Sequence, residues 1–173
     1  AYTSSDETVY INDIPANELE RWLQLESERF SLLVLRLFHT ELETVYEEFN
    51  RNQDDDIRWS NFAIDSMLIP NHPYGTQTTI GLGEHLKNPS MVNIHRYFDT
   101  YYVPNNVAII LSGDVNPSTA LPIIEKYFGA WAKKEVAPFV KKQPIPITTI
   151  HETEVIGPTK EHVYIGFRFD GDN

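Results

Sequence analysis

The strongest constraint on the fold is a helical pattern of apolar residues that runs through residues 17–50. Its acidic start, "NELERWLQLESERF", follows Pro15, and Glu18 and Glu20 are favoured in a first turn because the N-terminal end of a helix carries partial positive charge. The same period continues through "SLLVLRLFHTELETVYEEFN", where Ser31 is a candidate start for a second helix. The pattern therefore predicts one long helix or two consecutive helices.

Two further stretches have helical signals. "NPSMVNIHRYFDTYY" is predicted to be a helix capped by Asn88 or Ser90, with Pro89 near its start. "NPSTALPIIEKYFGAW" begins with a cap residue and a proline and is expected to end at Gly129. "NQDDD" and "NHPYG" are breaks on either side of a segment of mixed character.

Three runs have the character of strands. Residues 8–11 are a short β-prone run, "VAIILSG" (107–113) is predicted to be a buried strand, and "EHVYIGFRF" (161–169) alternates as strands do. Between the last two lies the proline-rich "VAPFVKKQPIPIT", which is typical of a linker crossing the surface. Helices and strands in this order predict an α+β fold.

The stretch "ELETVYEEFN" (41–50) contains four glutamates on two faces of the expected helix. At about 100° per residue, Glu41 and Glu48 lie on one face, which they share with the apolar residues Val34, Leu37, Phe38 and Val45. Glu43 and Glu47 fall on the opposite, solvated face. A carboxylate on a buried stripe must be paired, hydrogen-bonded or bound to a metal. A buried ion pair, a helix end that emerges into water near Glu48, and a metal site all remain open at this point.

The histidines do not complete a metal site. The chain contains neither HExxH nor HxxEH, the spacings that place two histidines on one turn of helix. His39 is four residues from Glu43, but Glu43 is on the solvated face, and the other five histidines are isolated in the sequence. We therefore expect no complete metal site within these residues.

Composition excludes several classes of function. The chain has 173 residues, no cysteine and a formal net charge of −11. The absence of cysteine excludes disulfides and thiolate chemistry, and the acidity without a basic cluster makes nucleic acid an improbable partner. No apolar stretch approaches the length of a membrane span. The start "AYTSSDETVY" has no signal peptide and reads as mid-domain sequence, so a fragment or processed product is expected.

Several stretches together resemble the insulinase/pitrilysin family of zinc peptidases, the inverzincins. They are the E-x6-E pattern of "ELETVYEE", "NHPYGTQTTIG", "YYVPNNVAIILSGDVNPSTALPIIEKYFGAW" and the opening "AYTSSDETVY", in the family's order and over nearly the whole chain. The resemblance implies a layered sheet with helices packed on it, as in a metallohydrolase-type domain. It implies peptide-bond hydrolysis by zinc-activated water.

The resemblance also assigns residues to roles. Glu48 is similar to the family's third zinc ligand, and Glu41 to an acidic residue that supports the site from behind the ligands. The opening residues Ala1, Tyr2 and Thr3 resemble an edge strand that pairs with an extended substrate peptide. The family's HxxEH segment, with two histidine ligands and the general-base glutamate, is not in this chain. The chain alone is therefore expected to bind no zinc tightly and to be inactive, although the parent protein would use zinc.

The resemblance implies a domain plan and two alternatives for function. Residues 1–135 would be the C-terminal portion of a peptidase-type domain, 136–160 a proline-rich linker, and 161–173 the first strand of a following homologous domain. The parent would be a zinc-dependent endopeptidase or oligopeptidase. Alternatively, it would be a non-catalytic peptide-binding or structural subunit of a two-component peptidase. Expected partners are a peptide or small-protein substrate and a homologous domain of the same or a partner chain; the compartment stays open, with export from a bacterial cytoplasm one option.

Overall fold

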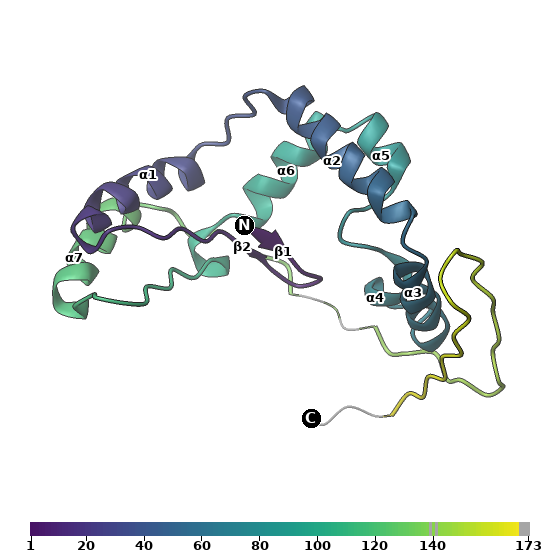
Figure 1. The fold of residues 1–173 in the computed structure, drawn as a ribbon. Helices are drawn as coiled ribbons and strands as arrows, with labels where there is room; N and C mark the ends of the chain where they lie inside the picture. The colour runs from purple at the N-terminus through teal and green to yellow at the C-terminus, as the bar shows by residue number, and fades with distance from the viewer. Residues whose placement is uncertain (139, 141, 170–173) are drawn as a thin grey trace. The chain divides into compact units, whose positions relative to one another are not determined.

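The protein is mostly helical in the computed structural model, which describes residues 1–138, 140 and 142–169 (Figure 1). The elements are, in chain order, β1 (Tyr2–Thr3), β2 (Thr8–Val9), η1 (Ala16–Glu18), α1 (Leu19–Ser31), α2 (Phe38–Gln53), α3 (Asp56–Leu68), α4 (Pro73–Thr76), α5 (Gly83–Lys87), α6 (Met91–Tyr101), η2 (Pro104–Asn106) and α7 (Pro117–Phe128). They divide into two compact units that interleave in the sequence.

Unit 1 comprises Ala1, residues 10–36 and the described part of 90–139. Helix α1 packs against α7, and these helices contribute the buried residues Leu23 and Ala120; Val103, just after α6, is also fully enclosed. Lys126 Nζ lies 2.7 Å from a carboxylate oxygen of Glu20, which links α7 to α1 at the surface. An exposed pair of this kind contributes little to stability, so the apolar contacts hold the two helices together.

Unit 2 comprises residues 2–9, 37–89 and the described part of 140–173. Helix α3 packs against α4 and α2 against α5, and the hairpin β1–β2 belongs to the same unit. The extended segment near the C-terminus is tied to α3 by Arg168, which donates to the carbonyl oxygens of Leu68 (2.5 Å) and Ile145 (2.6 Å). Unit 2 is therefore held together by helix pairs and by long-range hydrogen bonds to extended backbone.

The local sequence signals placed three helices correctly. Helix α1 covers the acidic first stretch, and α6 begins after Ser90, whose hydroxyl accepts from the Asn93 N–H, so Ser90 rather than Asn88 is the cap. In α7, the cap is Asn116, whose side chain accepts from the Ser118 N–H, and the helix ends before Gly129. Caps and prolines act within one turn of helix, so such signals are readable from sequence.

The boundary between the first two long helices differs from the expectation. Helix α1 ends at Ser31, and α2 begins only at Phe38, after Leu37, whose φ of 54° places it in the left-handed region. That conformation costs a leucine about 1 kcal/mol or more. Val34 and Leu37 therefore lie outside the helix that the periodicity predicts for them, and both are exposed.

The predicted layered sheet is not present in the described part of the chain, where one two-stranded sheet pairs β1 with β2. Thr8 and Val9 are a strand as expected, but residues 107–113 and 161–169 are not. The prediction that 107–113 is a buried strand is wrong here, because Ile110 is 84% exposed. A strand needs a hydrogen-bonded neighbour, and these two segments have no strand partner among the described residues.

The predicted domain boundaries at 135 and 160 stay predictions. Residues 142–160 contain no helix or strand, as expected of the proline-rich segment, whereas positions 139 and 141 and the last four residues of the predicted strand 161–173 lie outside the described residues. The mixed segment after "NQDDD" is helix α3, which the sequence analysis left unassigned. None of the helices within the described ranges is long and apolar enough to span a bilayer.

The N-cap of α3 provides a first test of the fold. Asp55 accepts a hydrogen bond from the Arg58 N–H at 3.1 Å. Replacing Asp55 with alanine should lower the free energy of unfolding of unit 2 by about 1 kcal/mol, because the first turn loses an acceptor and a favourable negative charge. Chemical denaturation of Asp55→Ala against the neighbouring Asp54→Ala, which removes the same charge without a cap bond, would measure the difference; equal values would contradict the capping role.

Candidate functional site

Helix α2 carries the two glutamates that the sequence singled out. Both are exposed, as are Glu43 and Glu47 on the other side of the helix. The expectation that Glu41 and Glu48 lie on a buried stripe is therefore wrong in this structure, whereas the solvated face was placed correctly. Their proposed roles at a metal site are a separate matter that burial does not decide.

The two glutamates are exposed because α2 begins later in the sequence than expected. With Val34 and Leu37 outside α2, its half-buried stripe consists of Phe38, Leu42, Val45, Tyr46 and Phe49. At about 100° per residue, the middle of this stripe lies roughly 90° from the two glutamates. Helix α5 covers one end of the stripe: a Cβ built on Gly83 would lie 3.0 Å from the Phe49 ring, and Lys87 Nζ lies 5.6 Å from the Tyr46 ring centre. Glu41 and Glu48 flank the stripe instead of lying on it.

The described residues do not form a complete metal site. No three histidine, cysteine, aspartate or glutamate side chains gather in a way that could hold an ion within residues 1–138, 140 and 142–169. Zinc sites in proteins use three or four protein ligands. A metal site that used a carboxylate of α2 would therefore need further donors from outside the described residues.

The hairpin of β1 and β2 contains two of the other predicted site residues, Tyr2 and Thr3, while Ala1 precedes β1 and belongs to unit 1. Among the described residues the sheet has two strands, so the outer edge of β1, like that of β2, has no strand partner. Tyr2 pairs with Val9 and Thr3 with Thr8, and the Ser4 N–H donates to the Glu7 carbonyl at 2.8 Å. Because backbone groups alternate in direction along a strand, the N–H and C=O of Thr3 point away from β2. Of the three predicted residues, Tyr2 is turned toward its partner strand, and Thr3 presents its backbone to the open edge.

A contact that the sequence analysis did not find joins this hairpin to the helices of unit 2. The hydroxyl of Tyr74 donates to the carboxylate of Asp6, which is in the turn between β1 and β2. The hydrogen bond to Asp6 raises the pKa of the Tyr74 hydroxyl above its usual value, so the donor keeps its proton well above neutral pH. Tyr74 belongs to "NHPYG", whose composition predicts only a break, because no local signal links residues so far apart in sequence.

Helix α4, which carries Tyr74, is fixed closely on α3. Gly75 is buried, and a Cβ built there would lie 2.4 Å from the Ile69 carbonyl oxygen and 2.7 Å from that of Asp65. Ser66 donates from its hydroxyl to the Gly75 carbonyl at 2.7 Å. The backbone approach at Gly75 requires a residue without a side chain. The position of Tyr74 is thus set by backbone contacts within unit 2.

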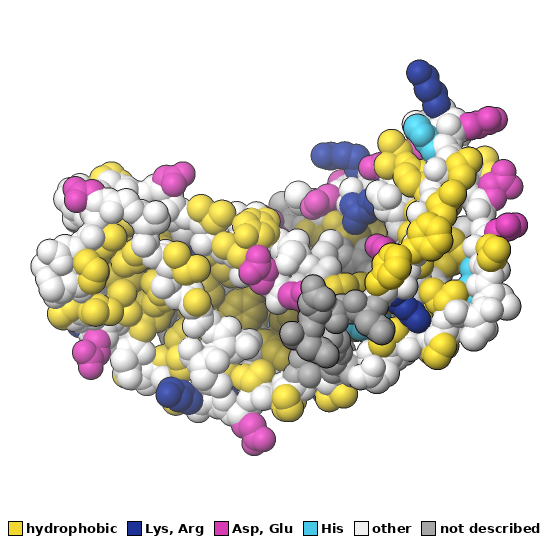
Figure 2. Space-filling model, turned by 90° about the horizontal axis from the view of Figure 1, so that it is seen from below, with side chains coloured by type: hydrophobic (Ala, Val, Ile, Leu, Met, Phe, Trp, Pro, Cys, Tyr) yellow, Lys and Arg dark blue, Asp and Glu magenta, His cyan; other side chains and the backbone are white. Residues whose placement is uncertain are grey.

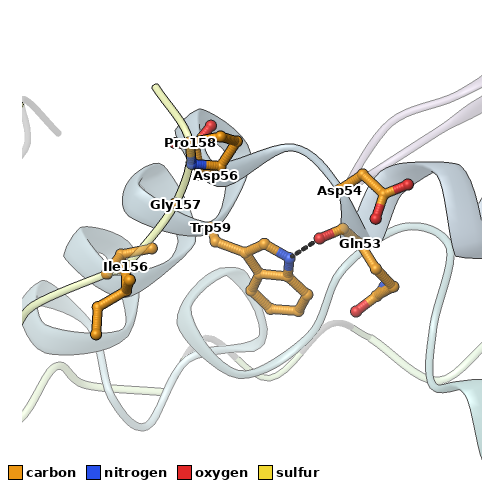
Figure 3. Close-up of a pocket in the computed structure, with 8 residues that line it drawn as sticks. Gln53, Asp54, Asp56, Trp59, Ile156, Gly157 and Pro158 are labelled. Carbon is orange, nitrogen blue, oxygen red and sulfur yellow. Dashed lines mark hydrogen bonds between the residues drawn. The ribbon is translucent and has the colours of Figure 1, made fainter. Parts of the chain in front are cut away.

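A cavity of about 430 Å³ opens at the start of α3 (Figure 3). It is lined by Gln53, Asp54, Asp56, Trp59 and residues 155–158. The Trp59 indole N–H donates to the Gln53 carbonyl at 3.2 Å, and Thr159 donates to Asp56 through its backbone and its hydroxyl. These hydrogen bonds lower the pKa of Asp56. The polar groups of Trp59 and Asp56 are thus engaged in hydrogen bonds within unit 2.

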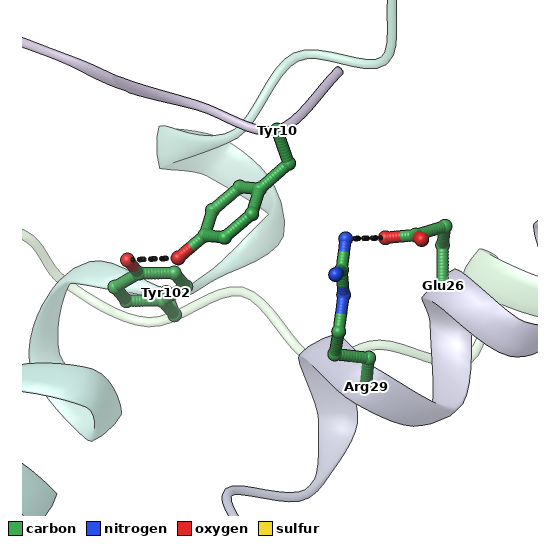
Figure 4. A network of polar contacts seen from close by, with 4 residues as sticks. All are labelled: Tyr10, Glu26, Arg29 and Tyr102. Carbon is green, nitrogen blue, oxygen red and sulfur yellow. Dashed lines mark hydrogen bonds and ion pairs between the residues drawn. The ribbon is translucent and has the colours of Figure 1, made fainter. Parts of the chain in front are cut away.

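Unit 1 contains an aromatic cleft of about 250 Å³. The Tyr10 and Tyr102 hydroxyls lie 2.9 Å apart, and Arg29 pairs with the buried Glu26 (Figure 4). The Arg29 guanidinium also lies 4.9 Å from the Tyr10 ring centre. Burial, followed by the hydrogen bond to Tyr10, raises the pKa of Tyr102. The cleft is mainly a packed aromatic cluster, which stabilises the region between α1 and α6.

Hydrophobic side chains are widely distributed on the surface. Figure 2 shows many of them on the viewed face. The extended segment 161–169, which has no strand partner among the described residues, contains several of them, including Val163, Ile165, Phe167 and Phe169, and Ile110 in the segment 107–113 is also exposed. Extended backbone with exposed apolar side chains is characteristic of segments that pair with other strands.

Comparisons with known proteins agree on one group of peptidases. Residues 92–173, just under half of the chain, match the family model described as "Peptidase M16 inactive domain". The chain is 28% identical over 130 residues to "Probable zinc protease PqqL" of Escherichia coli (strain K12) and 29% identical over 131 residues to "Zinc protease PqqE" of Helicobacter pylori (strain ATCC 700392 / 26695). These alignments cover 72% and 74% of this chain.

A solved structure shows the same relationship. "The crystal structure of a protease from Helicobacter pylori" is 26% identical and superposes with a TM-score of 0.58 over 75% of this chain. The chain spans 31% of that structure, and 14% and 29% of the length of the E. coli and H. pylori relatives. It thus corresponds to a limited part of each of these proteins.

Proposed function

Because the chain belongs to the insulinase/pitrilysin family of M16 peptidases, we propose that it is part of a zinc-dependent endopeptidase or oligopeptidase. In this proposal Glu48 is one zinc ligand, and Glu41 supports the site from about two turns of helix away on α2. The remaining ligands and the general base are supplied from outside these 173 residues. By themselves the 173 residues are expected to be inactive.

The placement of Glu48 on an open helix face is the observation that supports this proposal. A carboxylate that ligates a metal together with donors from another segment must face away from the core of its own unit. Glu48 meets that condition, since it is exposed on α2 and flanks the half-buried stripe through which its helix packs. Glu41 lies on the same face, two turns of helix from Glu48, where a second carboxylate can hydrogen-bond a ligand.

The open edge of β1 suits substrate binding. An extended peptide added beside β1 would donate to the Thr3 carbonyl and accept from the Thr3 N–H, in the strand-addition mode that peptide-binding domains use. Ala1 and Tyr2 would flank this contact. Backbone pairing recognises peptides with little dependence on their side chains, which is consistent with a general peptidase.

The layered sheet that the family resemblance implies is also part of the proposal. We propose that residues 107–113 and 161–169 become strands when they pair with segments outside this chain. Along residues 107–111, half-buried and exposed residues alternate, which is the pattern of a strand covered on one face. The hydrophobic residues that are exposed in 163–169 would be covered in the same way.

A second candidate function is a non-catalytic subunit of a two-component peptidase. The observation that favours it is the description of the matching family model, which names an inactive domain. Such a subunit would keep the fold and the peptide-binding edge without hydrolysing the peptide. The presence of both Glu41 and Glu48 favours the catalytic candidate, because a subunit without zinc has no need of two carboxylates on one helix face.

The two candidates differ in zinc content and turnover. Native mass spectrometry of the full-length protein, with a fluorogenic peptide library as substrate, would compare them. The peptidase proposal expects one zinc per catalytic site and cleavage that is lost with a chelator and recovered with zinc. Peptide binding without zinc and without cleavage would support the non-catalytic subunit instead. A protein that neither binds nor cleaves peptides would contradict both candidates.

A further inference from the structure

We propose that Tyr74 is a positioning residue that holds the substrate-binding hairpin in place through Asp6. This inference rests on the proposed function, because it assumes that the open edge of β1 pairs with a peptide. It assigns to the tyrosine of "NHPYG" a role in peptide affinity, although Tyr74 does not itself touch the edge.

The hairpin is too small to be stable by itself. Each strand contains two residues, and an isolated two-stranded hairpin is at best marginally stable in water. Its side-chain contacts between strands are weak: the Thr3 and Thr8 hydroxyls lie 3.4 Å apart, and the Tyr2 hydroxyl lies 3.4 Å from Glu7. An ordered edge therefore requires contacts to the helices of unit 2.

The hydrogen bond from Tyr74 to Asp6 is such a contact. It joins the hairpin turn to α4 across 68 positions in the sequence, and its acceptor is charged, which makes it stronger than a neutral hydrogen bond. The turn is close to the pairing residues, since Asp6 is three residues from Thr3. A hinge movement at the turn would therefore move the whole edge.

Helix α4, which carries Tyr74, is held firmly on α3. Gly75 packs without space for a Cβ against the end of α3, and Ser66 holds its carbonyl. The ring of Tyr74 also lies edge-on to His72, with ring centres 4.6 Å apart. The backbone of α4 is restrained at Gly75, and the Tyr74 ring contacts His72, so the Tyr74 hydroxyl reaches the hairpin from a helix that is fixed on α3.

The variant Tyr74→Phe removes the donor and keeps the ring. In the full-length protein, we expect amides of residues 2–9 to exchange hydrogen faster on the millisecond-to-second timescale, with residues 56–76 unchanged. The probe for affinity is the fluorescein-labelled peptide that binds the wild-type protein most tightly in a random library. Its dissociation constant should rise about 2- to 5-fold, the range for a partly exposed charged interaction.

Tyr101→Phe is the matched control, because Tyr101 and Tyr74 are each 40% exposed and Tyr101 lies in the other unit. It should leave both measurements unchanged. Asp6→Asn keeps a hydrogen-bond acceptor, so it should raise the dissociation constant for the peptide less than Asp6→Ala does. The double change Asp6→Ala with Tyr74→Phe should raise the dissociation constant no more than either single change, because both remove the same hydrogen bond.

The outcomes separate this inference from the proposed function. If the wild-type protein binds no peptide of the library, the proposed function fails before any variant is compared. If the wild type binds peptide but Tyr74→Phe matches Tyr101→Phe in affinity, the positioning role is overturned. Faster exchange in residues 2–9 with unchanged affinity would also overturn it, because Tyr74 would then stabilise the hairpin without serving peptide binding.

Discussion

Replacing Glu48 with glutamine in the full-length protein is expected to remove most bound zinc and to lower peptide hydrolysis by at least about 100-fold. The amide is isosteric with the carboxylate but carries no charge and is a much poorer ligand for zinc. A 100-fold loss corresponds to about 2.7 kcal/mol of lost transition-state stabilisation. The measurements are zinc per chain by elemental analysis and the kcat/KM for a fluorogenic peptide.

Glu47→Gln is the matched control for this experiment. Glu47 is the adjacent residue of α2, is also exposed, and loses the same charge on substitution. It should change neither zinc content nor hydrolysis by more than about 2-fold, as is usual for a surface substitution. Stoichiometric zinc in Glu48→Gln would remove Glu48 from the ligand set, and equal losses in both variants would indicate a general effect of charge on α2.

Replacing Leu23 with alanine is expected to lower the free energy of unfolding of unit 1 by about 2–5 kcal/mol. Leu23 is 0% exposed on α1, the helix that packs against α7, so its removal leaves a cavity in the interior of unit 1. Leu25 is on the same helix and is 63% exposed. The change Leu25→Ala should therefore cost less than about 0.5 kcal/mol.

Urea unfolding followed by tryptophan fluorescence can measure this effect for unit 1 alone. The chain has three tryptophans, of which Trp59 is in unit 2 and Trp22 and Trp131 are in unit 1. In a Trp59→Phe background, the fluorescence change reports on α1 and the residues after α7. Similar destabilisation by Leu23→Ala and Leu25→Ala would contradict the packing of α1 on α7.

The sequence was sufficient for the helices whose ends carry strong local signals. Ser90 and Asn116 cap α6 and α7 through hydrogen bonds to backbone groups two or three residues away, and Gly129 ends α7. Helix α3 was not assigned, although Asp55 caps it, because its apolar residues did not stand out between the two breaks. The family resemblance was also readable, since its motifs are short and come in a fixed order.

The candidate site was predicted less completely. The periodicity identified Glu41 and Glu48 as a pair on one helix face, which holds, but placed that face in the core, which does not. The error came from extending the helix through Val34 and Leu37. A break at Leu37 with positive φ has no local signal, because leucine is a good helix former and an unfavourable residue for that conformation.

The sequence by itself determined the resemblance to the family, the separation of the four glutamates into two pairs, and the helices that begin with a cap. These depend on residues close together in the chain. Only the tertiary structure decided which stripe of α2 is covered, that residues 107–113 and 161–169 have no strand partner among the described residues, and that Tyr74 meets Asp6. Burial, strand pairing and long-range hydrogen bonds each require a second segment of the chain, whose position is set by tertiary packing and not by local preference.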